Sequence, residues 1–384
     1  MSGCYVHLPF CDRICPYCDF AVVELRGRRV RRYLDALRAE IERSPHPIEP
    51  ISTIYLGGGT PSVHAPDDLA RLLATIFETF AVEAGSIECT LEANPSRLDD
   101  DRLRAARAAG ITRLSVGVQS LDDRELKTLG REHDAEQARD FVRAARAAGH
   151  RNVNLDLIAG VPGQSAGSFA RTLDAALALE PEHLSIYGLT IEAGTPYAAW
   201  QRRDPSAFPD DDAVGELLEI ARERLNGAGL HQYEISNFAR PGFACAHNLG
   251  YWRQFDCVAF GMSASGYERG MRYRNTRDFD RYCAAIESGE SARDYVERLA
   301  DGRRMGEAAM LALRTVDGIV DADFRARFGV DSVAAFRRAR KKCSAAGLLE
   351  VDARGARLTD RGRLLANSVC AEFLEPEMEI ATST

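Results

Sequence analysis

The sequence predicts an α/β protein built as a complete or partial (β/α)6-type barrel with a C-terminal helical, winged-helix-like domain. Short apolar, β-branched runs alternate six times with longer amphipathic stretches before about residue 200. That pattern then stops, and a second pattern of short helices around a small hairpin begins near Gly302. A length of 384 residues is enough for a barrel and an added domain.

The first 200 residues carry the alternating pattern. Strands are expected at residues 5–8, 51–56, 86–92, 113–118, 152–158 and 183–189. Helices are expected between them at residues 31–43, 67–80, 100–109, 135–148 and 168–179. Gly110 and Gly149 each follow such a helix as stop signals. This repetition predicts parallel strands joined by right-handed crossovers. A doubly wound sheet is the alternative, which periodicity alone does not exclude.

The second half of the chain is less regular. We expect a loop at residues 201–212, a helix at 213–225, one more strand at 231–238 and an irregular segment at 241–270. Further helices are expected at residues 305–313, 321–328, 333–346 and 359–371, with a hairpin formed by 348–351 and 356–358. The expected organisation is a barrel domain at 1–240, a connecting segment at 241–300, a winged-helix-like domain at 301–376 and a frayed tail at 377–384.

The composition excludes several classes of protein. With 45% apolar and 28% charged residues, the chain is globular rather than disordered. A net charge of −8 argues against nucleic-acid binding through global charge. The first residues lack the basic start and apolar run of a signal peptide, and no uninterrupted apolar stretch approaches the length of a membrane span. A cytoplasmic location is therefore expected, where ten reduced cysteines favour metal or redox chemistry.

Three cysteines form the strongest local motif. Cys11, Cys15 and Cys18 stand in a C-x3-C-x2-C loop, which can bind three irons of a [4Fe–4S] cluster. The fourth iron of such a cluster stays open to a small molecule. The alternative is structural zinc with His7 as the fourth ligand. The seven remaining cysteines are scattered and are expected to be buried small hydrophobic residues.

The cysteine loop and the motifs that follow it resemble a known family. The spacing, with Tyr17 just before the last cysteine, resembles the radical S-adenosylmethionine (SAM) superfamily. A glycine turn, residues 57–61, follows the second strand, and polar motifs follow at 92–95, 115–120, 129–133 and 154–158. In this order they resemble the family of oxygen-independent coproporphyrinogen III dehydrogenase (HemN) and its relative HemW, from Tyr5 to about Phe373.

The resemblance implies a SAM site beside the cluster. Cys11, Cys15 and Cys18 would hold the cluster, and the SAM site would be lined by Tyr5, Tyr17, Gly58, Gly59, Thr60, Glu92, Gln119, Arg131 and Asp156. The glycines permit close backbone approach and are expected to offer bare N–H groups. Carboxylates can accept from ribose hydroxyls or an amine, and arginine can neutralise a carboxylate. The superfamily chemistry is reductive cleavage of SAM to a 5′-deoxyadenosyl radical.

Three features favour the HemW branch over the dehydrogenase. Only ten residues precede Cys11, where the dehydrogenase has a longer segment, and Phe20 stands where the dehydrogenase has a fourth cysteine. The H-N-x-x-Y-W motif of the HemW group is also present, and implies heme contacts from His247, Asn248, Tyr251 and Trp252. Cys245 is an alternative heme ligand. On the residues alone, the favoured reading is structural, with His247 and Asn248 hydrogen-bonding a loop and with Tyr251 and Trp252 filling the core. His7 is expected to be structural or pocket-lining.

The branch implies a heme-binding chaperone with a [4Fe–4S] cluster and SAM. Its partners would be heme, heme-accepting proteins that can be membrane-associated, and an electron donor. The alternative is the dehydrogenase, which oxidatively decarboxylates two propionates of coproporphyrinogen III; that activity is not expected here. The basic runs at residues 28–32 and 337–342 are expected to be solvated helix faces. The C-terminal domain is expected to be a lid rather than a nucleic-acid module.

Overall fold

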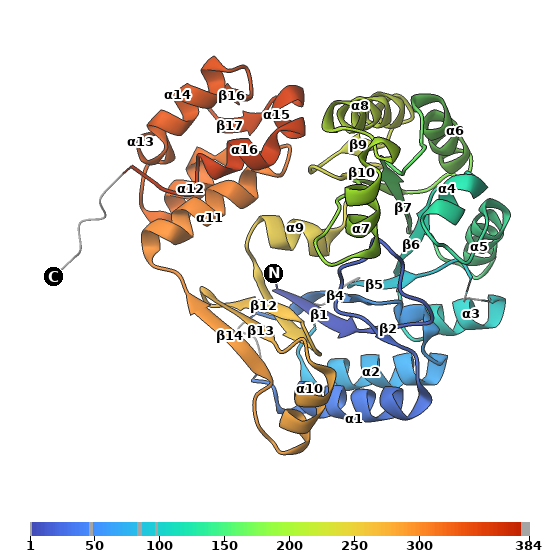
Figure 1. The fold of residues 1–384 in the computed structure, drawn as a ribbon. Coiled ribbons are helices and arrows are strands. Elements are labelled where there is room, and N and C mark those ends of the chain that lie inside the picture. Colours follow the sequence, from blue (N-terminus) through green and yellow to red (C-terminus); the bar gives the residue numbers. More distant parts are fainter. Residues whose placement is uncertain (1, 46–48, 83–86, 97–98, 378–384) are drawn as a thin grey trace.

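A twelve-stranded sheet, counted over the part of the chain that the structure describes, curves into a partial barrel (Figure 1). The computed structural model describes residues 2–45, 49–82, 87–96 and 99–377. Six parallel strands neighbour one another in chain order: β1 (Ser2–Leu8), β4 (Ile51–Gly58), β5 (Glu88–Ala93), β6 (Arg113–Gln119), β7 (Val153–Ala159) and β8 (His183–Gly188). This order has no reversal point, so the doubly wound alternative is wrong and the barrel prediction is confirmed.

Helices lie on the outer face of these strands. They are α1 (Gly27–Arg43), α2 (Pro66–Thr79), α3 (Asp100–Ala108), α4 (Asp123–Thr128), α5 (Ala135–Ala147), α6 (Ala166–Leu177) and α8 (Asp211–Gly227). Local signals set their starts: Asp134 and Gln137 form a reciprocal capping box at α5, and Asp99 caps α3. The boundaries of the five helices expected before residue 190 agree within about two residues, except that α1 begins four residues earlier than expected. Ser86 of the third expected strand lies outside the described residues.

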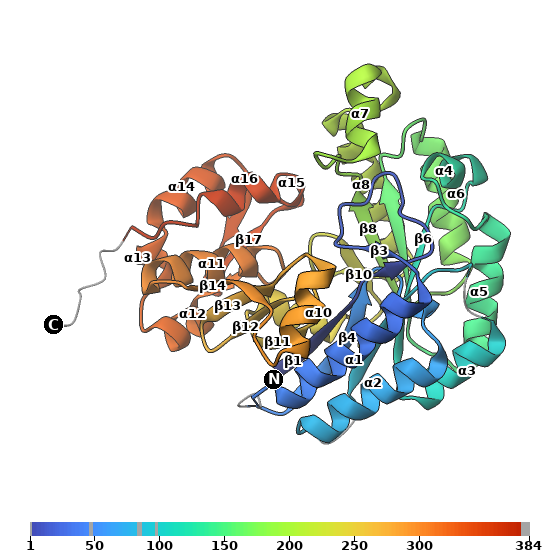
Figure 2. The same cartoon turned by 60° about the horizontal axis from the view of Figure 1, so that its bottom comes forward.

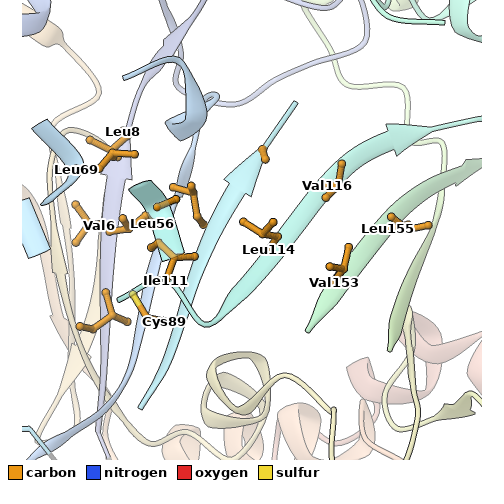
Figure 3. Packing of buried hydrophobic residues seen from close by; sticks show 14 of the residues in the cluster. Val6, Leu8, Leu56, Leu69, Cys89, Ile111, Leu114, Val116, Val153 and Leu155 are labelled. Carbon is orange, nitrogen blue, oxygen red and sulfur yellow. The ribbon is translucent and has the colours of Figure 1, made fainter. Parts of the chain in front are cut away.

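Alternation along each strand divides its side chains between two environments. Val6 and Leu8 of β1, Leu114 of β6 and Leu155 of β7 face outward and form one continuous core with the helices, including Leu69 of α2 (Figure 3). The intervening residues face the barrel interior. They include Tyr5 of β1, Tyr55 of β4, Glu92 of β5, Ser115 of β6, Asp156 of β7 and Ser185 of β8. A polar, hydrogen-bonded interior is thus encoded by every second residue of otherwise apolar strands.

The segment expected to be irregular, residues 241–270, is ordered. It contains α9 (Ala246–Trp252), β11 (Asp256–Phe260) and β12 (Ser265–Glu268), followed by β13 (Met271–Asn275), α10 (Phe279–Glu287) and β14 (Arg293–Arg298). β11 pairs in parallel with β1, so this segment extends the sheet instead of only connecting two domains. Elements of four to seven residues are too short to show a clear period in sequence, which explains the error.

Two other expectations need correction. The loop at 201–212 is partly helical, because α7 (Pro196–Arg203) continues into it and a 3-10 turn follows at Pro205–Ala207. The single strand at 231–238 is two short antiparallel strands, β9 (His231–Gln232) and β10 (Asn237–Ala239). The remaining short barrel elements are β2 (Phe10–Cys11), β3 (Val23–Glu24) and a 3-10 turn at Pro61–Val63.

The C-terminal part has its own apolar core, formed by residues between Met305 and Phe373. It contains α11 (Asp301–Leu313), β15 (Ile319–Val320), α12 (Asp321–Phe328), α13 (Ser332–Ala335), α14 (Arg337–Ala345), β16 (Leu349–Val351), β17 (Gly355–Leu358), α15 (Asp360–Leu364) and α16 (Ala366–Ala371). The helices around a small sheet fit the winged-helix expectation. Two of the expected helices are each divided in two, at Phe336 and at Leu365. Of the expected frayed tail, residues 378–384 lie outside the described residues, and the Glu377 N–H donates to Ala335 O.

The C-terminal domain lies beside the barrel, next to the gap between the two edges of the twelve-stranded barrel sheet (Figures 1 and 2). On one side Glu307 of α11 pairs with Arg272 of β13. On the other side the Ile235 N–H, near β10, donates to Arg314 O. The domain therefore closes the side of the barrel. Among the described residues, no helix combines the length and the apolar character needed to cross a membrane.

Candidate functional site

The three motif cysteines lie in the loop after β1, at the carboxyl ends of the barrel strands. Cys11 is buried and its Sγ is 3.4 Å from Thr60 Oγ1. Cys15 Sγ accepts from Arg131 Nη1 at 3.5 Å, and the Cys18 N–H closes a turn onto Cys15 O. No group of three His, Cys, Asp or Glu side chains in the described ranges is arranged to hold one metal ion. A four-iron cluster spreads its cysteines over different irons, so these thiols need not meet at one point.

His7 is structural. Its Nδ1 is 3.0 Å from the Tyr5 hydroxyl and its Nε2 is 2.9 Å from Ala21 O. Both ring nitrogens are thus used within the protein, so the geometry gives no support to the zinc alternative with His7 as a ligand. The second bond ties β1 to the chain just beyond the cysteine loop, which identifies His7 as a support for that loop.

The glycine turn packs against the start of the cysteine loop. A Cβ on Gly58, whose φ is +113°, would lie 2.5 Å from the His7 ring, and one on Gly59 would lie 2.7 Å from Pro9 C. The expectation of bare N–H groups is wrong, because Gly59 N–H donates to Leu8 O, Thr60 N–H donates to Phe10 O, and Gly58 N–H is also bonded. Glycine is needed here for close packing of two backbone segments.

Glu92 links the glycine turn to the barrel interior. Its carboxylate accepts from the Gly58 N–H at 2.9 Å and from the Tyr55 hydroxyl at 2.9 Å. Burial raises the pKa of Glu92 to about 7, against the lowering effect of these two hydrogen bonds. A carboxyl group at this position can therefore change its charge near neutral pH, or be held ionised by a bound cation.

The other predicted SAM residues face the same interior or its mouth. Asp156 accepts from Asn154 Nδ2 at 2.8 Å and from the Ser115 hydroxyl at 3.3 Å, and burial raises its pKa. Gln119 ends β6 at an irregular register with φ +66°. Arg131 donates to Gly117 O at 2.8 Å, and Tyr17 packs edge-on against Tyr197. The structure thus brings the predicted residues together around one interior.

The donor set of this interior fits a polar, charged ligand. Arg131 Nε is buried and has no hydrogen-bond partner among the described residues. Among the described residues, the Gln119 side-chain amide makes no hydrogen bond, although it lies near Arg131. Such polar groups are costly to leave unpaired in an interior. The unpaired groups of Arg131 and Gln119 are available to a ligand that carries carboxylate and hydroxyl groups. The protein's own carboxyl groups, on Glu92 and Asp156, can accept hydrogen bonds from an amine or a ribose of that ligand.

The H-N-x-x-Y-W segment lies at the other end of the barrel. It forms α9, which closes the amino ends of β1, β4 and β11. His247 is buried, with Nδ1 2.8 Å from Thr53 Oγ1 and Nε2 3.0 Å from the Tyr251 hydroxyl. Its ring stacks on Tyr55, and burial lowers its pKa to about 3. With both nitrogens engaged, the described conformation gives His247 a structural role, and its heme contact stays a prediction.

The other residues of this segment differ in their surroundings. Asn248 is half-buried, and the Tyr251 ring is 37% exposed while its hydroxyl bonds to His247. Cys245 is buried and its thiol lies against Glu88. Trp252 ends α9 and turns toward the C-terminal domain, where Arg314 lies over its ring. Of the four predicted heme residues, Trp252 is the one that borders a large cavity.

Sequence reasoning missed the groups that hold α9 in place. Glu88 of β5 accepts from the Ala246 and His247 N–H groups, each at 2.9 Å, at the start of this helix. Arg113, at the start of β6, is buried close to Glu88, which balances part of its charge. His183 bonds both Asn154 and the Tyr233 hydroxyl beneath the interior. The available signal was the alternation inside each strand, which put a polar residue at every second position.

Comparison with known proteins agrees with this architecture. The radical SAM superfamily model matches residues 5–176, and the HemN C-terminal domain model matches residues 302–365. The heme chaperone HemW of Bacillus subtilis is 33% identical, over 97% of this chain and 99% of the relative. The chain belongs to the HemN/HemW family of radical SAM proteins. Membership of this family implies a [4Fe–4S] cluster and SAM.

Other relatives cover the chain equally well. The heme chaperone HemW of Mycobacterium tuberculosis is 37% identical, over 97% of this chain and 94% of the relative. Among solved structures, the radical SAM enzyme HemN of Escherichia coli, a coproporphyrinogen III oxidase, matches with a TM-score of 0.84 at 25% identity. That match covers 97% of this chain and 89% of HemN. The family and fold expectations are therefore confirmed. The roles of individual site residues stay predictions.

Proposed function

We propose that this protein is a HemW-type heme-binding chaperone that carries a [4Fe–4S] cluster and SAM and delivers heme to acceptor proteins. The observation that supports this most strongly is the likeness to HemW chaperones over 97% of the chain at 33 to 37% identity. HemN has the same fold at lower identity, so the fold alone does not choose between chaperone and oxidase.

Cys11, Cys15 and Cys18 would hold the cluster, and the nine interior residues named above would hold SAM. When bound, the cluster and SAM supply the chemistry of reductive SAM cleavage. Within the protein, Glu92 would accept from the methionine amine, and an amine beside it favours its ionised form. Arg131 would face the carboxylate, and Asp156 the ribose hydroxyls. Gly58 and Gly59 would keep the turn close to the cysteine loop.

Phe20 supports the chaperone over the oxidase. It occupies the position of the fourth cysteine of the dehydrogenase, and its side chain is 71% exposed beside the cluster loop. Unlike a cysteine, an exposed phenylalanine can neither bind a metal through its side chain nor transfer a proton. An electron donor is the expected further partner at this face. The acceptor proteins would be heme proteins, membrane-associated or not, and the cytoplasm is the proposed compartment.

An anaerobic assay separates the two activities. The reconstituted protein is supplied with SAM, a reductant and coproporphyrinogen III, and the products are separated and quantified as porphyrins after oxidation. We expect no protoporphyrinogen IX above a control lacking SAM. Formation of that product in catalytic amounts would contradict the chaperone assignment and establish the oxidase.

A further inference from the structure

A layer of buried polar side chains crosses the barrel interior on the amino-end side of the predicted SAM site. Ser115 of β6, Asn154 of β7 and His183 of β8 are register partners on three neighbouring parallel strands. Val153 and Leu155, the neighbours of Asn154 along β7, face outward into the core, so alternation turns Asn154 into the interior (Figure 3). The three polar residues are each 4% exposed or less, so their hydrogen bonds have to be made within the protein.

The hydrogen atoms around Asn154 have one consistent arrangement. Its Nδ2 is 2.8 Å from Asp156 Oδ1 and 2.7 Å from Ser115 Oγ, while its Oδ1 is 2.6 Å from His183 Nδ1. An ionised carboxylate can only accept hydrogen bonds, so the amide group turned toward Asp156 has to be the NH2 group. The amide oxygen then faces His183, whose Nδ1 has to carry a hydrogen and donate it.

Tyr233 fixes the same hydrogen from the other side of the His183 ring. The Tyr233 oxygen accepts from the Cys245 N–H at 3.3 Å and lies 2.9 Å from His183 Nε2. Burial, followed by the charge of Arg113, lowers the pKa of His183 well below its usual value, so the ring is neutral. A neutral ring with its hydrogen on Nδ1 accepts at Nε2, where the Tyr233 hydroxyl donates. The chain of hydrogen bonds therefore runs in one direction, from the start of α9 to Asp156.

We infer that His183 and Asn154 are positioning residues for Asp156, an inference that rests on the proposed SAM site. The His183 Nδ1–H holds the Asn154 amide in one orientation, and its NH2 group then keeps the Asp156 carboxylate ready to accept from the ribose hydroxyls. With the hydrogen on Nε2 instead, a bare Nδ1 would face the amide oxygen at 2.6 Å and favour a flipped amide, with its C=O against the carboxylate.

The electrostatics of Asp156 agree with this role. Burial raises the pKa of Asp156, and the hydrogen bond from Asn154 opposes this rise more than any other contact does. Losing that bond would favour the protonated carboxyl group, which accepts fewer hydrogen bonds. Both Asn154 and His183 thus act through Asp156 rather than on SAM itself.

Two amide substitutions at His183 separate this role from support of the fold. The amide of His183→Asn can take the place of Nδ1 and still donate to Asn154, whereas that of His183→Gln reaches the place of Nε2 and keeps only the Tyr233 contact. Each variant therefore loses one of two buried hydrogen bonds, and thermal unfolding checks that both are folded. In equilibrium dialysis of the reconstituted protein, His183→Asn should bind SAM within about threefold of the wild type, and His183→Gln at least about tenfold more weakly.

A ligand without a ribose is the matched comparison. Methionine should shift the electron paramagnetic resonance signal of the reduced cluster at the same concentrations in the wild type and in His183→Gln. Asp156→Asn should weaken SAM binding as His183→Gln does. A loss of methionine binding as large as the loss of SAM binding would show a general disturbance of the site and overturn the inference.

The tautomer of His183 is measured without cofactors, by nitrogen-15 NMR of the histidine-labelled apo protein, with His183→Gln identifying the signals. We expect the hydrogen on Nδ1 at neutral pH. Hydrogen on Nε2, or equal SAM affinity in folded His183→Asn and His183→Gln, would overturn the inference while the SAM site stands. If the wild type binds no SAM, the proposed SAM site fails and this inference fails with it.

Discussion

Substituting Gly58 by alanine tests how the glycine turn and the cysteine loop depend on each other. Gly58 has φ +113°, where an L-residue costs about 1–2 kcal/mol. The added Cβ would also lie 2.5 Å from the His7 ring, which is buried and held by hydrogen bonds at both nitrogens. Overpacking of this kind adds about 1–3 kcal/mol. The expected total loss of unfolding free energy is therefore about 2–5 kcal/mol.

Gly163→Ala is the matched control. Gly163 has φ +81° but nothing lies within 4 Å of its added Cβ, so this variant carries the backbone cost without the clash. Urea unfolding of the apo protein measures both variants, and iron analysis after anaerobic reconstitution measures the effect on the cluster. We expect Gly58→Ala to be the more destabilised of the two and to hold less iron than Gly163→Ala. Equal stability and equal iron content would refute the packing argument.

Three further predictions concern the two ends of the barrel. His247→Ala loses two buried hydrogen bonds and a ring stack, so urea unfolding should show a loss of about 2–4 kcal/mol, whereas exposed His231→Ala should be near neutral. Because the pKa of Glu92 is raised from 4.5 to about 7, the folded apo protein binds this proton more tightly, and its stability should fall as pH rises from 4.5 to 7. Glu92→Gln should flatten that dependence, and SAM binding by the wild type should strengthen as pH rises through about 7; a pH profile identical in both proteins would refute the role of Glu92. Cys15→Ser should reduce reconstituted iron to background, while Phe20→Cys should leave it at about four irons per chain; a full cluster in the serine variant would exclude Cys15 as a ligand.

Much of the barrel could be predicted from the sequence because its signals are local. The strands expected at residues 113–118 and 152–158 match the observed strands within one residue at each end. Stop signals such as Gly110 and Gly149, both at positive φ, mark helix ends correctly. The C-x3-C-x2-C motif could likewise be recognised, because its three cysteines lie within eight residues of one another in the chain.

The remaining features depend on contacts between distant residues. β11 is five residues long and is fixed by pairing with β1, some 250 residues earlier in the chain. The role of His247 follows from Thr53 and Tyr55, which its own motif does not reveal. Likewise, the N–H groups of Gly59 and Thr60 looked available in sequence, but carbonyls of residues 8 and 10 accept from them. Long-range pairing of this kind leaves no local periodic signal.

The central claim is that this protein carries heme as unaltered cargo. The most direct measurement is heme titration of the reconstituted protein with SAM present, followed by gel filtration and chemical analysis of the released tetrapyrrole. The account predicts one heme retained per chain and recovered unchanged. Failure to retain heme at the concentration of the protein, or recovery of a modified tetrapyrrole that depends on SAM, would contradict it.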